Sequence, residues 1–191
     1  MANRYLLLII DAQKGIDEAQ HWGGNRNNPN AELKINTLLK IFRDSNLPII
    51  HIQHSSTDPN SPLKAGQIGH DFKDNCKPET GEVVIQKRTT NAFINTSLQE
   101  NLIAFDADII VIVGFVTNNS VEATTRMSGS LGFQSILVSD ATATFDKIGL
   151  DGQIFPSELV HNISLANLNG EYATVLNTIE LIDLIKSEIP S

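Results

Sequence analysis

The stretch YLLLII at residues 5–10, followed directly by Asp11, decides the fold class. All six of its residues are apolar, which is typical of a central strand covered on both faces of a parallel sheet. Further apolar runs alternate with segments of helical period along the whole chain, and this alternation predicts a parallel α/β architecture. We expect residues 1–191 to form a single domain, because no interdomain linker, internal repeat or low-complexity tract interrupts the pattern.

Capping residues and apolar runs predict where helices, strands and loops lie along the rest of the chain. Asn30 and Thr178 are expected N-caps, and residues 96–100 have capping-box spacing twice over. One helix is expected from about Ser120 to Leu131, ending at Gly132. A long loop over residues 55–82 is predicted to be functional, since loops of this length are rare as mere connectors. The six predicted strands are residues 5–10, 48–53, 83–86, 109–114, 135–139 and 172–175.

Composition and charge exclude several classes of function. The 191 residues carry a formal charge of -8, which argues against a nucleic-acid partner because a phosphate backbone attracts a basic surface. A single cysteine, Cys76, cannot form an internal disulfide, which favours a reducing compartment, and we interpret it as incidental to function. No run approaches the ~18 apolar residues of a membrane span, so we expect a soluble, cytoplasmic protein without a membrane partner.

Three polar residues follow apolar strands and are expected to meet at one edge of the sheet. Asp11, Lys87 and Ser120 each stand just after such a strand, and parallel α/β sheets bind ligands outside the carboxyl ends of their strands. Alternatives remain for each: Asp11 as a structural cap or ion-pair partner, Lys87 as a surface lysine, and Ser120 as a helix N-cap. An acid, an amine and a hydroxyl brought together form a workable catalytic set.

Other candidates carry weaker signals. The aromatic residues Trp22, Phe93 and Phe115 flank strand ends and are candidates to line an apolar pocket. His51 and His54 lie three apart on a strand and point to opposite faces, so a shared metal is not expected. No histidine is obviously placed to activate Ser120. Phosphate-binding, dinucleotide-binding and His-Glu-x-x-His motifs do not occur, and we expect neither metal nor cofactor.

The motifs together resemble the isochorismatase-like cysteine hydrolases over nearly the whole chain. Their order and spacing make the resemblance more specific than any single motif. The matching stretches are LLLIIDAQKGI (6–16), SPLKAGQIGHDFK (61–73), VIQKRTTNAF (84–93), IVIVGFVTNNSVEATTRMSGSLGF (110–133), LVSDATATFD (137–146) and ELVHNISLANLNGEYATVLNT (158–178).

The resemblance implies a fold and a site. It implies a three-layer α/β/α, Rossmann-like sandwich with a mainly parallel six-stranded sheet, assembled as a homodimer or higher homo-oligomer. The family's Asp-Lys-Cys triad maps onto Asp11, Lys87 and position 120. A cis peptide bond at Val116–Thr117 is implied, aiming backbone amides at an oxyanion. The residues expected to bind substrate are Gln13, Trp22, Phe93, Thr117 and Asn119.

Two departures from the family pattern affect the expected chemistry. Position 120 is Ser, and a hydroxyl forms an anion far less readily than a thiol, which puts a thioester route in doubt. The isochorismatase branch of the family works without the cysteine, using the Asp as an acid on a vinyl ether. Nicotinamidase-like relatives carry an Asp-x-His pair that binds metal. The corresponding positions here are His54 and Ser56, so that ligand set is missing and no catalytic metal is expected.

These observations predict a hydrolase of a small, carbonyl- or carboxylate-bearing metabolite, cleaving an amide or carbamoyl C–N bond or a vinyl-ether C–O bond. Asp11 is expected to act as acid and base, Lys87 to orient it and offset negative charge, and Ser120 to hold a substrate oxygen or act as a weak nucleophile. The alternative is a catalytically inactive ligand-binding or regulatory protein on the same fold. A third interpretation is that Ser120 is an engineered replacement for cysteine.

Overall fold

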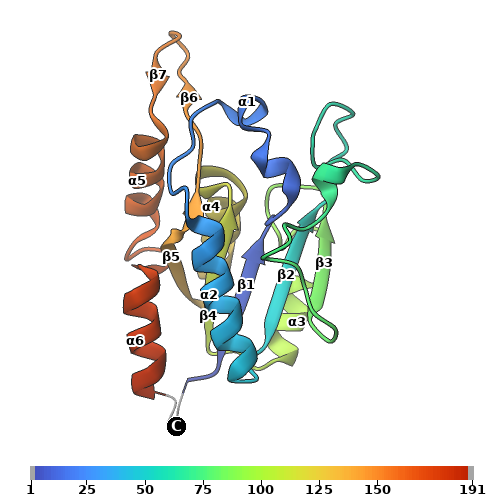
Figure 1. Ribbon diagram of the computed structural model, residues 1–191. Coiled ribbons are helices and arrows are strands. Elements are labelled where there is room, and N and C mark those ends of the chain that lie inside the picture. Colours follow the sequence, from blue (N-terminus) through green and yellow to red (C-terminus); the bar gives the residue numbers. More distant parts are fainter. Residues whose placement is uncertain (1–2, 189–191) are drawn as a thin grey trace.

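A six-stranded sheet forms the centre of the molecule, with strand order β3-β2-β1-β4-β5-β8 and every neighbouring pair parallel. The computed structural model describes residues 3–188 (Figure 1). The α/β prediction is therefore confirmed. The strands are β1 (Tyr5–Ile10), β2 (Ile49–His54), β3 (Val83–Lys87), β4 (Ile109–Phe115), β5 (Gln134–Ala143) and β8 (Thr174–Leu176).

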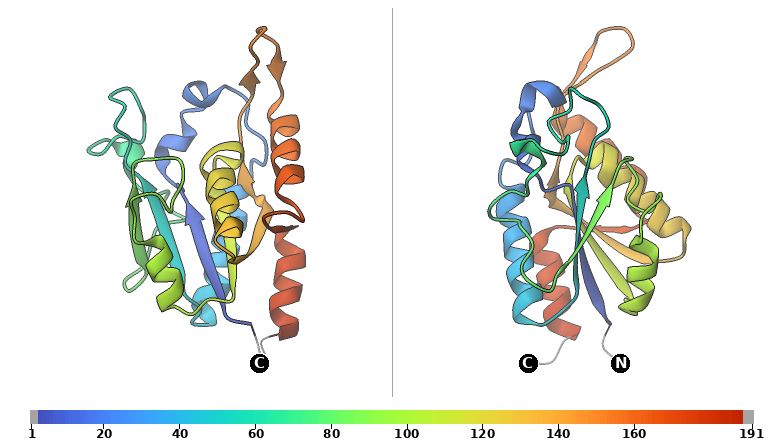
Figure 2. Two further views of the ribbon diagram at one scale, coloured as in Figure 1. Left: turned by 180° about the vertical axis from the view of Figure 1, so that it is seen from behind. Right: turned by 90° about the vertical axis from the view of Figure 1, so that its right-hand side faces the viewer.

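Helices cover both faces of this sheet and produce three layers (Figure 2). The alternating residues of β1 serve both faces: Tyr5, Leu7 and Ile9 pack on one side, with α2 and α6. Their neighbours Leu6, Leu8 and Ile10 pack on the other side, with α3 and α5. The helices are α1 (Ala19–Trp22), α2 (Ala31–Asp44), α3 (Leu98–Ala104), α4 (Glu122–Ser130), α5 (Ser157–Leu168) and α6 (Thr178–Glu188).

A short antiparallel hairpin, β6 (Lys147–Ile148) with β7 (Ile154–Phe155), projects beyond the carboxyl ends of the main sheet (Figure 1). Residues 149–152 form its turn, in which the Gly152 amide donates to the Gly149 carbonyl at 3.0 Å and Gly152 has a φ of +84°. None of the helices within residues 3–188 combines the length and the apolar composition that crossing a membrane requires.

Several predicted element boundaries need correction. Strand β5 runs to Ala143, four residues beyond the expected end, because Asn28 Nδ2 donates to the Ser139 and Thr142 carbonyls and Thr142 pairs with Gly114. The expected helix at residues 120–131 is a π-helical turn over Thr117–Val121 followed by α4. Such insertions occur frequently at functional sites.

The predicted helix caps are also only partly right. Thr178 is not the N-cap of α6: its hydroxyl donates to Asp140, whereas Asn177 Oδ1 accepts from the amides of Ile179 and Glu180 at 2.9 and 3.0 Å. Asn30 stands at the N-cap of α2, but its side chain makes no capping hydrogen bond. The side chain of Ser97, before α3, makes no capping bond either, so no capping box forms there.

Gly114 lets strands β1 and β4 approach at the edge that carries Asp11. Its φ is +118°, and a Cβ atom at this position would lie 2.0 Å from the Ile10 carbonyl oxygen. The register of β4 against β5 shifts between Ile112 and Gly114. Just after this irregularity β4 ends, and the chain enters the π-helical turn that contains Ser120.

We expect Gly114→Ala to destabilise the fold by well over 2 kcal/mol, because overpacking of about 1–3 kcal/mol adds to a left-handed backbone cost of about 1–2 kcal/mol. Gly132→Ala is the matched control: its φ of +88° is also positive, but its Cβ would meet no atom within 4 Å. Urea unfolding of both variants measures the difference. Equal destabilisation would contradict the role given to the close approach at Gly114.

Candidate active site

Asp11, Lys87 and Ser120 meet at the carboxyl end of the sheet. Lys87 Nζ lies 2.7 Å from Asp11 Oδ2 and 2.9 Å from Ser120 Oγ, so one ammonium bridges the carboxylate and the hydroxyl. The residues come from the ends of β1 and β3 and from the turn after β4, which are distant in sequence. The structure therefore brings together all three residues that the strand-end pattern singled out.

The Asp11 carboxylate is held at the edge of the apolar core with one oxygen free. Asp11 is 2% exposed, and its φ is +50°, a backbone conformation that L-residues rarely adopt. Its amide donates to the Ile52 carbonyl at 3.0 Å, which fixes the chain next to β2. Asp11 Oδ1 is buried and has no hydrogen-bond partner among the described residues. Buried polar atoms are normally satisfied, so this oxygen is available to a substrate or a water molecule.

Lys87 is a buried ammonium rather than a surface lysine, since it is 1% exposed. Besides Asp11 and Ser120, its Nζ contacts the Thr89 and Thr90 carbonyls at 3.1 and 3.2 Å. It also lies 3.2 Å from His54 Nδ1. A buried charge is stable only when it is paired and hydrogen-bonded, and these contacts supply such partners and fix the position of Lys87.

Ser120 does not cap a helix. It lies inside the π-helical turn, is 7% exposed, and makes no capping hydrogen bond. Its Oγ accepts from Lys87, and in residues 3–188 no imidazole or carboxylate lies within hydrogen-bond distance of it. A serine needs an adjacent base to become a strong nucleophile, and this hydroxyl lacks that partner.

A cavity of about 180 Å³ opens directly onto Asp11 and Ser120. It is smaller than the ~300–1,000 Å³ typical of sites for drug-sized ligands, so it suits a small metabolite. Its lining combines apolar side chains with polar ones from the long loop and from the segment after β1. The lining residues are Asp11, Ile16, His21, Trp22, His54, Ser56, Asp58, Ser61, Leu63, Thr90, Phe115, Val116, Asn119 and Ser120.

Comparison with known proteins decides the family. The model of the isochorismatase domain matches residues 5–180, almost the whole chain. The chain belongs to the isochorismatase family. Members of this family are hydrolases, and the chain is accordingly a hydrolase of the isochorismatase type.

Similar proteins cover the chain nearly end to end. The isochorismatase family protein YrdC of Bacillus subtilis is 40% identical over 188 residues, which is 98% of this chain and 100% of YrdC. A hydrolase of the isochorismatase family from Chromobacterium violaceum is 43% identical with a TM-score of 0.91, covering 97% of this chain and 94% of that one. An isochorismatase from Pseudomonas putida is 31% identical with a TM-score of 0.84, covering 93% and 89%.

Two of the residues expected to bind substrate line the cavity of this isochorismatase-family chain. Asn119 does so beside Ser120, and Trp22 does so from α1. The Trp22 indole is held in place, since its Nε1 donates to the Gly15 carbonyl at 2.8 Å and its ring stacks on Phe145 at 6.4 Å. Both residues are therefore placed to contact a bound molecule.

The other three expected substrate-binding residues lie away from the cavity lining. Phe93 packs on the face of the sheet formed by Leu6, Leu8 and Ile10, where its ring stacks on Phe133 at 6.3 Å. Thr117 is fully buried, and its hydroxyl lies 2.9 Å from His161 Nδ1. Gln13 is also fully buried and hydrogen-bonds backbone groups of the long loop and β2. None of these three side chains is therefore placed to contact a molecule in the cavity.

The cis peptide bond is one residue earlier than the resemblance implied, at Phe115–Val116 instead of Val116–Thr117. The amides of Asn119 and Val121, at 3.0 and 3.3 Å, both donate to the Val116 carbonyl. These two N–H groups are therefore already engaged and are not free donors for a substrate oxyanion.

From the sequence, His54 was considered only as a metal ligand, whereas the structure places it in the site beside Asp11 and Lys87. It ends β2, pairs in register with Lys87 of the neighbouring strand, and lines the cavity. Burial lowers the pKa of His54 below its ordinary value; the Asp11 carboxylate and the Thr89 carbonyl oppose this, while Lys87 reinforces it. The imidazole is therefore neutral near pH 7. Its place at a strand end beside Asp11 was a usable signal, equal to the one that identified Lys87.

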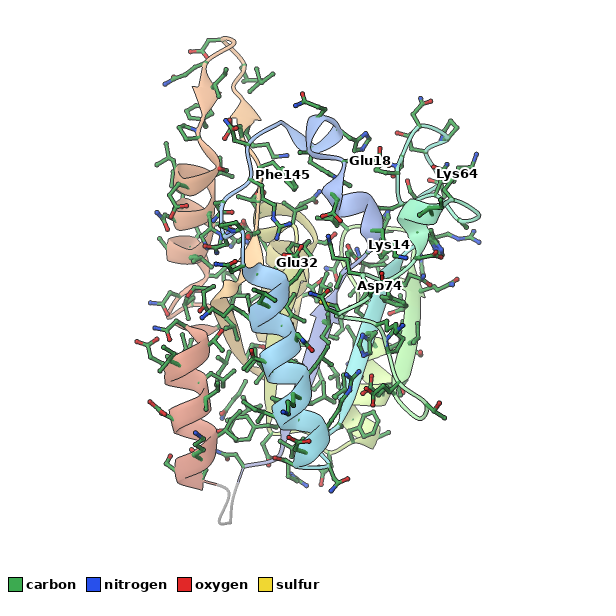
Figure 3. All side chains as sticks on the ribbon, viewed as in Figure 1. Lys14, Glu18, Glu32, Lys64, Asp74 and Phe145 are labelled. Carbon is green, nitrogen blue, oxygen red and sulfur yellow. The ribbon has the colours of Figure 1, made fainter. Side chains whose placement is uncertain are left out.

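A charged cluster supports the Phe115 wall of the cavity. The Arg26 guanidinium lies 4.8 Å from the centre of the Phe115 ring, and it hydrogen-bonds Glu32 at 2.7 and 2.8 Å. Glu32 lies in the first turn of α2 (Figure 3) and also pairs with Lys73 at 3.1 Å. Burial raises the pKa of Glu32, but Arg26 and Lys73 outweigh this and lower it.

Proposed function

We propose that this chain hydrolyses a small metabolite by direct attack of water, with Asp11 moving the protons and no covalent intermediate on Ser120. The observation that carries the proposal is the Lys87 ammonium, which bridges Asp11 Oδ2 and Ser120 Oγ, while Asp11 lines the cavity and its Oδ1 has no hydrogen-bond partner among the described residues. A base is thus available to water, whereas the hydroxyl has no base of its own.

The arrangement supports cleavage of an amide or carbamoyl C–N bond. Asp11 takes a proton from water as the water oxygen bonds to the carbonyl carbon, giving a tetrahedral intermediate. The C–N bond then breaks, and Asp11 returns the proton to the leaving nitrogen. Lys87 remains protonated throughout and offsets the negative charge near the carboxylate. The Ser120 hydroxyl donates to the substrate oxygen.

Cleavage of a vinyl-ether C–O bond uses the same residues in another order, with Asp11 giving a proton to the vinyl carbon before water adds. The ion pair with Lys87 presents Asp11 as a carboxylate, which is a base, and this favours the C–N reaction. A screen of amides, ureido acids and enol ethers against the purified chain separates the two. Turnover of enol ethers alone would assign the vinyl-ether reaction.

The charges at the cavity favour an uncharged substrate. Lys87 neutralises Asp11, the remaining ionised lining residue is Asp58, and none of the lining residues is Lys or Arg. This differs from the expectation that a carboxylate-bearing metabolite would fit. For a matched pair of amides with and without a carboxylate, we expect the neutral compound to have the lower KM, by about tenfold if the anion loses about 1.4 kcal/mol of binding. A lower KM for the anion would contradict this.

Ser120→Ala tests whether the hydroxyl is a nucleophile. If water attacks directly, the variant keeps measurable turnover with a reduced kcat, because only one hydrogen-bond donor to the substrate oxygen is lost. Complete loss, equal to the loss in Asp11→Asn, would point to a covalent seryl route. Binding of the screened compounds without any product, detected as thermal stabilisation of the wild-type chain, would instead support a ligand-binding role.

Ser120→Cys is expected to create a reactive thiol, since an adjacent ammonium favours the thiolate. The native chain is a clean control. Its single cysteine, Cys76, is buried, and burial raises the pKa of its thiol to about 12. Mass spectrometry after iodoacetamide treatment of the folded proteins should find one label in the variant and none in the wild type. An unlabelled variant would show that position 120 is inaccessible from the cavity.

A further inference from the structure

We propose that His54 is a further catalytic residue, which donates a hydrogen bond from Nε2–H to the carbonyl oxygen of the substrate and stays neutral while doing so. The inference rests on the proposed function, because it assigns a role within that hydrolysis. It adds a group that the Asp-Lys-Ser set does not contain.

The backbone on both sides of His54 is fixed. The His54 amide donates to Gln13 Oε1 at 2.8 Å, and Gln13 Nε2 donates to the His54 carbonyl at 3.1 Å. The same Nε2 donates to the His70 carbonyl at 2.8 Å, which ties the 3₁₀ turn η2 (Ile68–His70) to this point. A fully buried amide thus anchors the imidazole at the cavity wall. Such preorganisation is what a hydrogen-bond donor in catalysis needs.

The contact with Lys87 selects the tautomer of His54. An ammonium has only donors, so the contact of Lys87 Nζ with His54 Nδ1 at 3.2 Å favours the tautomer in which Nδ1 accepts, in competition with the Thr89 carbonyl, which accepts a ring N–H in the other tautomer. The ring proton then resides on Nε2, and Nε2 has no hydrogen-bond partner in the part of the chain that the structure describes. The ring also lines the cavity beside Asp11. A neutral imidazole can polarise a carbonyl group by such a hydrogen bond without transferring its proton.

The site also needs this donor. The developing negative charge on a carbonyl oxygen requires preorganised N–H or O–H groups. The amides of Asn119 and Val121 are spent on the Val116 carbonyl, and Lys87 has more acceptors around it than its three protons can serve. His54 Nε2–H, the Ser120 hydroxyl and the Asn119 side-chain amide are side-chain donors of the cavity lining that fit this purpose.

Two substitutions distinguish a catalytic His54 from one that only holds Lys87. In His54→Asn the amide oxygen takes the place of Nδ1 and still accepts from Lys87, but the donor at Nε2 is lost. In His54→Gln the side-chain amide reaches the Nε2 position and keeps a donor there. We expect His54→Asn to lower kcat by about 10²-fold, the usual effect of removing one oxyanion donor, with KM little changed. His54→Gln should retain more activity. The opposite order would overturn the proposal.

A second measurement does not depend on turnover. The ¹⁵N chemical shifts of the imidazole in the wild-type chain report which nitrogen holds the proton. Nε2–H supports the proposal, whereas Nδ1–H, donated to the Thr89 carbonyl, would overturn it. Asp11→Asn is assayed alongside the His54 variants. If Asp11→Asn is inactive but His54→Asn is fully active, only the role of His54 fails. If the wild type hydrolyses nothing, the proposed function fails. The ¹⁵N measurement then still shows whether His54 carries its proton on Nε2.

Discussion

Asp11→Asn is expected to lower kcat by about 10²–10⁴-fold, the range that general acid–base catalysis contributes. The amide oxygen of Asn still accepts a hydrogen bond from Lys87, so the side chain keeps its place at the end of β1. It cannot take a proton from water, however, and it cannot return one to the leaving nitrogen. Steady-state kinetics on the best substrate from the screen measures the loss.

Ser120→Ala is the matched control for Asp11→Asn, because it alters the other partner of the same ammonium and leaves the carboxylate in place. Circular dichroism and thermal unfolding establish that each variant is folded before its rate is compared. Substantial turnover by Asp11→Asn would remove Asp11 from the acid–base role and with it the proposed mechanism.

The position of the site was predictable from strand ends alone. Apolar runs identified the strands, parallel pairing brings their carboxyl ends to one edge, and Asp11 and Lys87 follow directly from that rule. Ser120 required more, because the π-helical turn and the close approach at Gly114 set its direction. Its placement was nevertheless foreseeable from the strand-to-helix junction.

Side-chain direction beyond the strand ends was not predictable. Phe93 comes only six residues after Lys87, yet it does not line the cavity and instead packs on Phe133 in the core cluster that contains Ile85. Gln13 was expected to touch substrate, but it clamps the long loop to β2. These outcomes depend on a side chain (Phe133) and on backbone carbonyls (His54 and His70) contributed by distant segments, and such partners leave no trace in the local pattern of residue types. The expected homo-oligomer stays a prediction.

The family resemblance predicts that Ser120 stands where relatives carry a thiol, and the geometry around Ser120 is compatible with a mechanism that does not need one. The Asp11 carboxylate and the Lys87 ammonium are both buried, although a buried ion pair is costly to keep without a purpose. Side chains that only maintained the fold at this point could be apolar. The proposed mechanism gives the pair such a purpose, with Asp11 moving protons beside its counter-ion and the Ser120 hydroxyl donating to the substrate.

Lys87→Met is expected to destabilise the fold by about 3–5 kcal/mol, because it leaves the Asp11 carboxylate buried without its counter-ion. The double variant Asp11→Asn/Lys87→Met carries neither charge and should be more stable than Lys87→Met alone. Urea unfolding of the wild type, both single variants and the double variant gives the coupling free energy.

Lys64→Met, at an exposed position of the long loop, is the control and should change stability by less than about 0.5 kcal/mol. Additive effects of the two site substitutions would show that the buried pair does not act as a unit, and Lys87 would then have to be explained by its contacts with the Thr89 and Thr90 carbonyls.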